Sequence, residues 1–253
     1  MFESPPAASH PDKGRSVRAM FDAIAPRYDL ANAVLSAGAD RGWRRAAVDA
    51  AWAKGPRDLL DVATGTADLA LALARGRPEA RVRGVDFAEA MLEVGRRKVA
   101  RAGAQVALDV GDGTDLPYAD ASFDAVTIAF GLRNFADPDA GLREFRRVLR
   151  PGGRAVVLEF PPPPRGAFGA AFRLYFTQVL PRLGGALSGN RAAYAYLPAS
   201  AMAFPPPHEL AGRMRAAGFD DVVWTPLTFG VAALHVADVA PATAARPPRQ
   251  EPA

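Results

Sequence analysis

Apolar and polar positions follow two alternating periods along the middle of this 253-residue chain. Short apolar runs of strand length each precede a longer stretch in which apolar residues recur every three or four positions, the spacing of an amphipathic helix. Strands that alternate with helices in this way predict a mostly parallel sheet with helices on both faces. The predicted strands are 58–63, 80–87, 105–112, 123–130 and 154–160, and the predicted helices between them are 67–76, 88–103 and 139–150.

The C-terminal third interrupts this rhythm and then resumes it. Residues 161–207 begin with four prolines and end with three, and the apolar, aromatic stretch between them predicts an irregular inserted lid. Residues 208–219 have the pattern of an amphipathic helix, and residues 222–239 predict two closing strands joined around Gly230. These two strands bring the predicted sheet to seven.

The segment before the first strand and the two ends differ from the alternating region. Residues 16–54 carry helical apolar spacing that Pro26 divides, so we expect a helical cap made of two helices. Residues 1–15 and 241–253 are rich in proline, alanine and polar residues, which is typical of mobile tails. The chain is therefore expected to form a single α/β domain over residues 16–240.

Composition narrows the classes of function. The chain has no cysteine, which excludes a disulfide framework, a thiolate metal site and a cysteine nucleophile. His10, His208 and His235 are too widely spaced for a metal motif, so no metal is predicted. Basic residues number 31 and acidic residues 27, without a run of five basic residues, which argues against nucleic-acid binding.

The lengths of the apolar segments bear on where the protein resides in the cell. No apolar run reaches the ~18 residues that span a bilayer. The first 15 residues lack the apolar core of a signal peptide. We expect a soluble, cytoplasmic protein that is at most attached to a membrane surface.

The turn after the first predicted strand carries candidate chemistry. Gly65 lets backbone amides approach a ligand closely, and the start of the following helix attracts an anionic group. Asp86 ends the next strand, 21 residues beyond Gly65, where a carboxylate can accept hydrogen bonds from two ribose hydroxyls. Asp112 and Gly113 end the third strand, where an acid can bond an adenine amino group and glycine admits the ring. An ordinary strand-to-helix turn is the alternative, and the lack of a full GxGxxG argues against a dinucleotide enzyme.

As a set, these features resemble the motif series of class I S-adenosylmethionine-dependent methyltransferases over roughly residues 55–160. Further segments are similar to the ubiquinone/menaquinone C-methyltransferase family, so that the resemblance spans about residues 17–238. The family usually has Met, His, a small hydroxyl residue and Ser where this chain has Ala31, Asp40, Ala129 and Pro161. The segments that carry the resemblance are 27–32 (RYDLAN), 130–134 (FGLRN) and 147–160 (RVLRPGGRAVVLEF), with later agreement at 194–197, 217–219 and 230–235.

The resemblance implies a Rossmann-like class I methyltransferase fold with S-adenosylmethionine as the cofactor. On the cofactor side it implies contacts at Thr66, Asp86, Asp112 and Gly113, next to the backbone of Gly65, with Ala129 close by. On the substrate side it implies roles for Arg133 and Asn134, on the loop after the fourth strand, and for Tyr28 in the cap.

The resemblance also implies the substrate, a reduced polyprenyl quinone precursor. Demethylmenaquinol is the first expectation and the benzoquinol of the ubiquinone pathway the second. We expect the methyl group to pass to a ring carbon beside a hydroxyl, with Arg133 stabilising the oxyanion and Asn134 orienting the ring. Tyr28 or a water is the hypothesis for proton removal. Two alternatives stay open: methylation of another small molecule, such as a sterol or a phospholipid amine, and a noncatalytic cofactor-binding subunit.

An aromatic stripe in the inserted lid is the last candidate feature. We interpret it as a cover over the substrate pocket that suits an isoprenoid tail or a membrane surface, with an ordinary core as the alternative. Glu159, which ends the fifth strand, either holds a loop or takes part in the chemistry, and His235 either packs in the core or lines the pocket. The stripe consists of Phe168, Phe172, Leu174, Tyr175 and Phe176.

Overall fold

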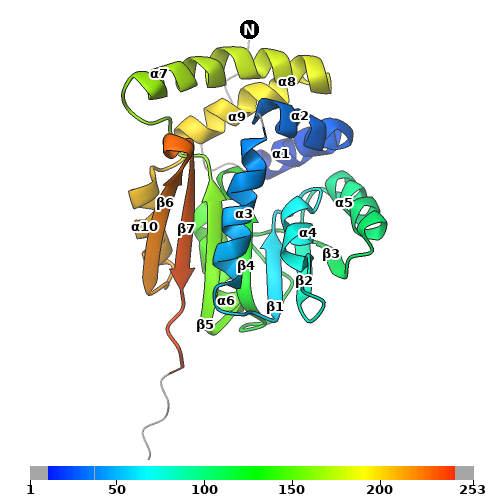
Figure 1. Ribbon diagram of the computed structural model, residues 1–253, viewed down its shortest axis with the longest axis vertical. Coiled ribbons are helices and arrows are strands. Elements are labelled where there is room, and N and C mark those ends of the chain that lie inside the picture. The colour runs from blue at the N-terminus through cyan, green and yellow to red at the C-terminus, as the bar shows by residue number, and fades with distance from the viewer. Residues whose placement is uncertain (1–10, 37, 243–253) are drawn as a thin grey trace, which may run out of the picture.

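The computed structural model describes residues 11–36 and 38–242 of the chain. Within that part, seven strands form one sheet in the order β3-β2-β1-β4-β5-β7-β6, with helices on both faces (Figure 1). This arrangement confirms the predicted Rossmann-like α/β fold. The strands are β1 (Asp58–Val62), β2 (Arg81–Asp86), β3 (Val106–Val110), β4 (Phe123–Ala129), β5 (Leu149–Glu159), β6 (Asp221–Leu227) and β7 (Ala232–Asp238).

The five strands from β1 to β5 are parallel to one another, and β7 runs antiparallel to both β5 and β6. The connection from β6 to β7 is only the short turn Thr228–Gly230, which joins antiparallel neighbours. Gly230 has a φ of 88° in this turn, in agreement with its predicted place between the closing strands.

Both faces of the sheet are buried, as strand alternation requires. Leu59 of β1 belongs to the layer formed with α3 and α4, and the next residue, Leu60, belongs to the layer formed with α6 and α10. The hydrophobic core therefore lies on both sides of the sheet and leaves its carboxyl edge for the site. The helices that accompany the sheet are α3 (Ala39–Trp52), α4 (Asp68–Ala74), α5 (Glu89–Ala102), α6 (Pro138–Val148) and α10 (Pro207–Ala216).

The N-terminal cap contains three helices, α1 (Pro11–Ile24), α2 (Tyr28–Leu35) and α3, where two were predicted. Pro26 lies in a 3₁₀ turn between α1 and α2, as expected, and the second break precedes α3 at Gly38, whose φ is 80°. The prediction of a tail up to residue 15 is wrong for residues 11–15, which begin α1. The rest of that tail, residues 1–10, and residues 243–253 of the other one lie outside the described residues.

The inserted lid is helical, and the prediction of an irregular segment is wrong for most of it. It contains α7 (Ala167–Leu174), the π-helical turn Tyr175–Val179, α8 (Leu180–Ser188) and α9 (Arg191–Ala203). Its prolines misled because Pro181 lies just after the π-helical turn, inside a helical stretch that runs without a break from residue 167 to 188, and Pro198 lies inside α9.

Cap and lid come together at one end of the molecule. In Figure 1, α1, α2, α7, α8 and α9 lie at the top, beyond the carboxyl ends of the parallel strands. Ligands of open α/β sheets bind at this edge. No helix in the described part of the chain is long and apolar enough to cross a membrane.

Candidate active site

The turn between β1 and α4 has an unusual backbone. Ala63, Gly65 and Ala67 have positive φ values of 51°, 56° and 66°. No other described atom lies within 4 Å of the place where a Cβ of Gly65 would stand, so the backbone here borders open space. The turn thus has the close-approach geometry that the sequence predicted for Gly65.

Asp86, at the end of β2, fixes this turn. Its carboxylate accepts hydrogen bonds from the backbone amides of Gly65 and Ala88, both at 2.8 Å. The side chain is buried, and this burial raises the pKa of Asp86 to about 6. An ionised carboxylate offers about four acceptor positions, so these amides do not exhaust the acceptor capacity of Asp86.

Asp61 is a second buried carboxylate, for which no role was predicted. It accepts hydrogen bonds from the hydroxyls of Thr64 at 2.6 Å and Thr127 at 2.8 Å. Burial raises the pKa of Asp61 to about 7. The sequence feature that could have identified Asp61 is its place in an otherwise apolar strand, because burying an unpaired charge is costly.

The loop after β4 holds Arg133 in a fixed position. The Arg133 guanidinium donates to Glu159 at 2.8 Å and to the Phe130 carbonyl at 2.6 Å. Glu159 also accepts a hydrogen bond from the backbone amide of Arg133 at 3.2 Å, so it binds both the backbone and the guanidinium of this residue. Arg133 is 8% exposed and Glu159 is 1% exposed, and the guanidinium lies 5.6 Å from the ring centre of Phe160. Glu159 therefore holds the loop, which was one of its two predicted roles.

Four polar atoms at the edge of this loop are buried without a hydrogen-bond partner in the described structure. Such atoms are costly unless a ligand or water completes their bonding. Tyr194 and Tyr196 come from α9 of the lid, and the sequence did not identify them as site residues because their approach to the β4 loop depends on how the lid folds. The atoms are Arg133 Nε, Asn134 Oδ1, Tyr194 OH and Tyr196 OH.

These atoms belong to residues that line a chamber of about 450 Å³ between the sheet edge, the cap and the lid. From the lid stripe, Phe168, Phe172, Tyr175 and Phe176 line it as well, whereas Leu174 is 63% exposed. The chamber thus joins the Gly65 turn to the β4 loop under an aromatic cover. The predicted site residues that line it are Tyr28, Gly65, Thr66, Ala129, Arg133 and Asn134.

Asp86, Asp112 and Gly113 are not among the lining residues. Asp86 lies directly behind Gly65, as its hydrogen bond shows. Asp112 is exposed and accepts two hydrogen bonds from Thr114, both at 2.8 Å. A Cβ on Gly113 would stand 2.2 Å from the Phe135 ring, so packing already requires glycine there. Contacts of Asp112 and Gly113 with adenine stay a prediction.

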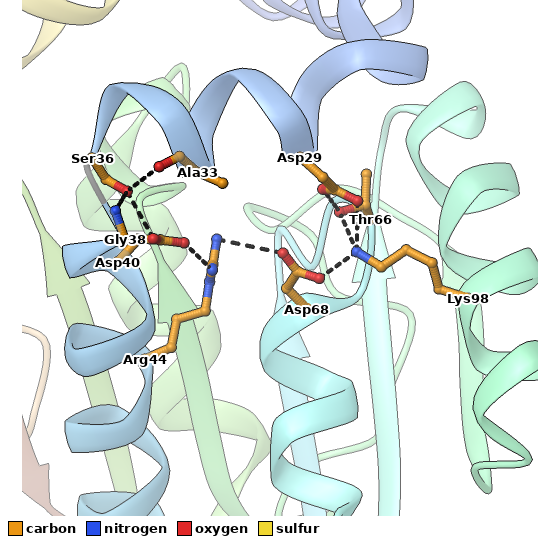
Figure 2. A network of polar contacts seen from close by, with 9 residues as sticks. All are labelled: Asp29, Ala33, Ser36, Gly38, Asp40, Arg44, Thr66, Asp68 and Lys98. Carbon is orange, nitrogen blue, oxygen red and sulfur yellow. Dashed lines mark hydrogen bonds and ion pairs between the residues drawn. The ribbon is translucent and has the colours of Figure 1, made fainter.

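A polar network ties the cap to the cofactor turn (Figure 2). Thr66 donates its hydroxyl to Asp29 of α2 at 2.6 Å, and Lys98 of α5 donates to the same carboxylate at 2.7 Å. Lys98 also pairs with Asp68, at the start of α4, and Arg44 of α3 lies 3.5 Å from Asp68. Three cap or flanking helices thus meet at the Thr66 turn.

The remaining candidates have structural surroundings. His235 is 1% exposed, its Nε2 lies 2.9 Å from the Pro207 carbonyl, and burial lowers its pKa. It does not line the chamber, so it packs in the core. Within residues 11–36 and 38–242, no group of three or more His, Cys, Asp or Glu residues could hold a metal ion.

Comparison with known proteins identifies the family of the chain and the reaction class of the site. Residues 9–238 match the ubiE/COQ5 methyltransferase family. The chain belongs to this family. It is therefore an S-adenosylmethionine-dependent methyltransferase.

Similar members of the family are close in length. A demethylmenaquinone methyltransferase of Deinococcus radiodurans is 55% identical over 234 residues, which cover 92% of this methyltransferase and 97% of that protein. One from Thermus thermophilus is 58% identical over 219 residues, which cover 87% and 99%. A ubiquinone/menaquinone biosynthesis C-methyltransferase UbiE of Geobacter sp. strain M21 is 46% identical over 228 residues, which cover 89% and 97%.

Solved structures share the fold of this methyltransferase. The [4+2]-cyclase SpnF superposes with a TM-score of 0.69 at 18% identity, covering 95% of this chain and 100% of SpnF. A SAM-dependent methyltransferase of Thermotoga maritima, described as a possible histamine N-methyltransferase, gives 0.62 at 18% identity and covers 88% and 99%. Because a cyclase shares the fold, the fold alone does not select the reaction.

The residues of the site fit S-adenosylmethionine. The open backbone at Gly65 and the hydroxyl of Thr66 border the chamber where the methionine part would bind, and Asp86 supports this turn from behind Gly65. The contact of Asp86 with ribose stays a prediction. Tyr28 and Phe130 add aromatic rings to the same chamber, which suits a sulfonium cation.

Proposed function

We propose that this methyltransferase methylates a ring carbon of a reduced polyprenyl quinone precursor, with demethylmenaquinol as the first candidate. Two relatives above 50% identity over nearly their whole lengths carry the name demethylmenaquinone methyltransferase, which supports this ring. A benzoquinol of the ubiquinone pathway is the second candidate, because a relative at 46% identity is named for both pathways.

The observation that carries the proposal is a permanent cation buried in an aromatic chamber. Arg133 is charged at all working pH values and is almost removed from water. A hydroquinone has a flat apolar ring, which suits the aromatic walls, and hydroxyl groups, which suit the unpartnered atoms of Arg133, Asn134 and Tyr194. A phospholipid amine or a sterol has no acidic hydroxyl for this guanidinium to stabilise.

The side chains divide the work in the following way. When bound, S-adenosylmethionine supplies an electrophilic methyl group. Arg133, held by Glu159, stabilises the oxyanion that forms as a ring hydroxyl loses its proton, which activates the neighbouring ring carbon. Asn134 orients the ring through its amide oxygen.

Tyr28 takes a different role from the proton removal that the sequence suggested. Burial raises the pKa of Tyr28 and also that of Tyr194. Both phenols therefore keep their protons at neutral pH. The Tyr28 hydroxyl is hydrogen-bonded to Asn32, and the unpartnered Tyr194 hydroxyl donates to a ring oxygen. A water remains as the acceptor for the hydroxyl proton and for the proton that the ring carbon loses once it carries the methyl group.

The test is methyl transfer with purified protein. The protein is incubated with methyl-labelled S-adenosylmethionine and, separately, with the reduced naphthoquinol and benzoquinol precursors, and the products are identified by mass spectrometry. We expect a methylated naphthoquinol. A labelled benzoquinol alone would favour the second candidate, and cofactor binding without any labelled quinol would overturn the proposal in favour of a noncatalytic subunit.

We also propose that the enzyme is cytoplasmic and that the lid contacts a membrane surface, where a polyprenyl substrate resides. Residues 160–208 contain no acidic residue and four arginines. Exposed apolar side chains in the same segment can insert shallowly into the membrane interface. They are Phe168 (48% exposed), Leu174 (63%), Val179 (40%) and Leu183 (46%).

A further inference from the structure

The proposed substrate is larger than the chamber that receives its ring. The chamber measures about 450 Å³ and must hold the ring together with the methionine part of the cofactor. Pockets of ~300–1,000 Å³ are typical for one drug-sized ligand, so no room is left for an isoprenoid tail. The tail must therefore leave the chamber through one of its walls.

A second cavity begins behind one wall of the chamber. It is a groove of about 900 Å³ between α1 on one side and α8 and α9 on the other. Met20 of α1 and Tyr196 of α9 line both the chamber and the groove. These two side chains are the shared wall, so the groove continues the chamber away from the cofactor turn.

The groove has the chemistry of a tail site. Alanines, prolines, Val17 and two methionines make up more than half of its lining, and no acidic side chain is among the rest. The uncharged polar residues of the lining are Ser16, Thr177, Gln178, Asn190 and Tyr196. Small apolar residues leave a narrow channel for a thin flexible chain, and methionine adapts to irregular shapes. Lys13, Arg182 and Arg191 are its three basic lining residues. The alanines are Ala19, Ala23, Ala192, Ala195 and Ala199.

The position of Tyr196 links ring and tail. Its hydroxyl is buried without a partner, and its pKa is raised by burial and influenced by the charges of Arg133 and Glu159. Tyr196 lines the chamber together with Arg133, and it also borders the groove. A ring oxygen held by Arg133 and Tyr196 would direct the adjacent tail past Tyr196 and Met20.

We propose that the groove between α1 and α8–α9 binds the polyprenyl tail of the quinol substrate. This proposal rests on the proposed function and adds the place where the tail lies. It assigns specificity for tailed substrates to the cap and lid together, since each contributes one wall.

The test fills the groove without touching the chamber. Ala19 and Ala195 line the groove and are exposed, so Ala19→Phe and Ala195→Phe can be accommodated without disturbing the core. Ala216→Phe on α10 is the matched control, because Ala216 is exposed and lines neither cavity. Kinetics are measured with 1,4-naphthohydroquinone without a tail and with a geranyl tail, both in detergent solution.

We expect the groove variants to raise KM for the geranyl substrate about tenfold, with kcat and KM for the tailless substrate unchanged. The control variant should match the wild type with both. An unchanged KM for the geranyl substrate, or an equal rise for both substrates, would overturn the groove proposal. If the wild type methylates neither quinol, the proposed function fails instead, so the two failures are distinguishable.

Discussion

Asp61, Asp86, Arg133 and Glu159 are charged residues that the fold removes from water, and each is held by different partners. Arg133 and Glu159 neutralise one another, whereas Asp61 and Asp86 have only hydroxyl and amide donors. Burying a charge without a counter-charge raises the pKa of a carboxyl group. The two aspartates therefore make the stability of the protein depend on pH.

Asp61→Asn should stabilise the protein at alkaline pH. The pKa of Asp61 is about 7 in the folded protein, well above the ~3.9 of an unfolded aspartate. Its favourable contribution is present below about pH 4 and is lost as the pH rises through 7. Asparagine carries no charge. Its amide oxygen can accept from one threonine hydroxyl while its amide nitrogen donates to the oxygen of the other, so we expect a gain of about 1–3 kcal/mol at pH 8 that shrinks toward pH 5.

Thermal melting at the two pH values measures this effect. Asp49→Asn is the control, since Asp49 is an exposed aspartate on α3. It should change the melting temperature little at either pH. A stabilisation by Asp61→Asn that is equal at pH 5 and pH 8 would contradict the assignment of the effect to ionisation.

Arg133→Gln should lower kcat about 100-fold, the usual loss when one oxyanion-stabilising contact is removed. Arg133→Lys keeps the charge but not the planar fork and should recover part of the rate. Removing Arg133 also leaves Glu159 buried and unpaired, which destabilises the protein.

The double variant Arg133→Gln with Glu159→Gln separates the two effects. It removes the unpaired charge, so we expect its melting temperature to return toward that of the wild type while kcat stays low. Single-turnover kinetics and calorimetry with S-adenosylhomocysteine provide the readouts. Recovery of turnover together with stability would assign Arg133 a purely structural role.

Single residues were predictable from sequence where a local motif exposes them. Gly65, Thr66, Arg133 and Asn134 follow strand ends, and parallel strands bring such positions to one edge. Tyr194 and Tyr196 follow no strand, and only the path of the lid brings them to Arg133.

At the scale of elements, the cap is joined to the cofactor turn by a few polar contacts. Lys98 of α5 reaches both Asp29 and Asp68, and Thr66 bonds Asp29 directly (Figure 2). Because Thr66 borders the chamber, the position of α2 and the shape of the cofactor turn are coupled.

Lys98→Ala should weaken cofactor binding although Lys98 does not line the chamber. Partly exposed ion pairs contribute up to about 1 kcal/mol, so we expect a loss of about fivefold in affinity for S-adenosylhomocysteine. Arg97→Ala on the same helix is the control, because its polar contacts within the described part of the chain are with Glu93. Calorimetry gives the affinity, and hydrogen exchange over residues 28–35 should increase only in the Lys98 variant. Unchanged exchange there would show that the network does not hold α2.

The lid shows why some elements resisted prediction. Its prolines have the appearance of breaks, yet Pro181 lies within a continuous helical stretch, two residues after the π-helical turn Tyr175–Val179. Such wider turns accommodate irregularities inside a helix. The helices of the lid bury Phe176, Leu180 and Tyr194 against the cap, and these long-range contacts stabilise what the local sequence does not specify.

At the scale of the whole molecule, the alternating pattern predicted the sheet but not the place of its last strands. The sequence shows two closing strands, and the insertion of β7 between β5 and β6 depends on packing across the sheet. The same insertion leaves β6 at the edge, at the side of the molecule in Figure 1.

Binding to anionic vesicles should depend on the lid. Leu174→Ser with Leu183→Ser should reduce the bound fraction on phosphatidylglycerol vesicles at least about tenfold, because shallow apolar insertion is lost. Val223→Ser is the matched control, since Val223 is 63% exposed on β6. Vesicle flotation measures the bound fraction, and added salt should weaken the wild type because the arginines act through charge. Equal loss in the control variant would refute a specific role for the lid.

The positive charge of the lid affects how the protein is oriented as it approaches a negatively charged surface. The formal net charge of +4 lies entirely within residues 160–208, because elsewhere 27 basic residues are matched by 27 acidic ones. The protein is thus an electric dipole with its positive pole at the lid. Near any negatively charged surface, rotational diffusion is biased so that the lid leads, and encounters arrive correctly oriented more often than random tumbling allows. The bias vanishes as salt shortens the Debye length below about 10 Å. The rate of association with such a surface should therefore depend on salt through the four arginines of the lid.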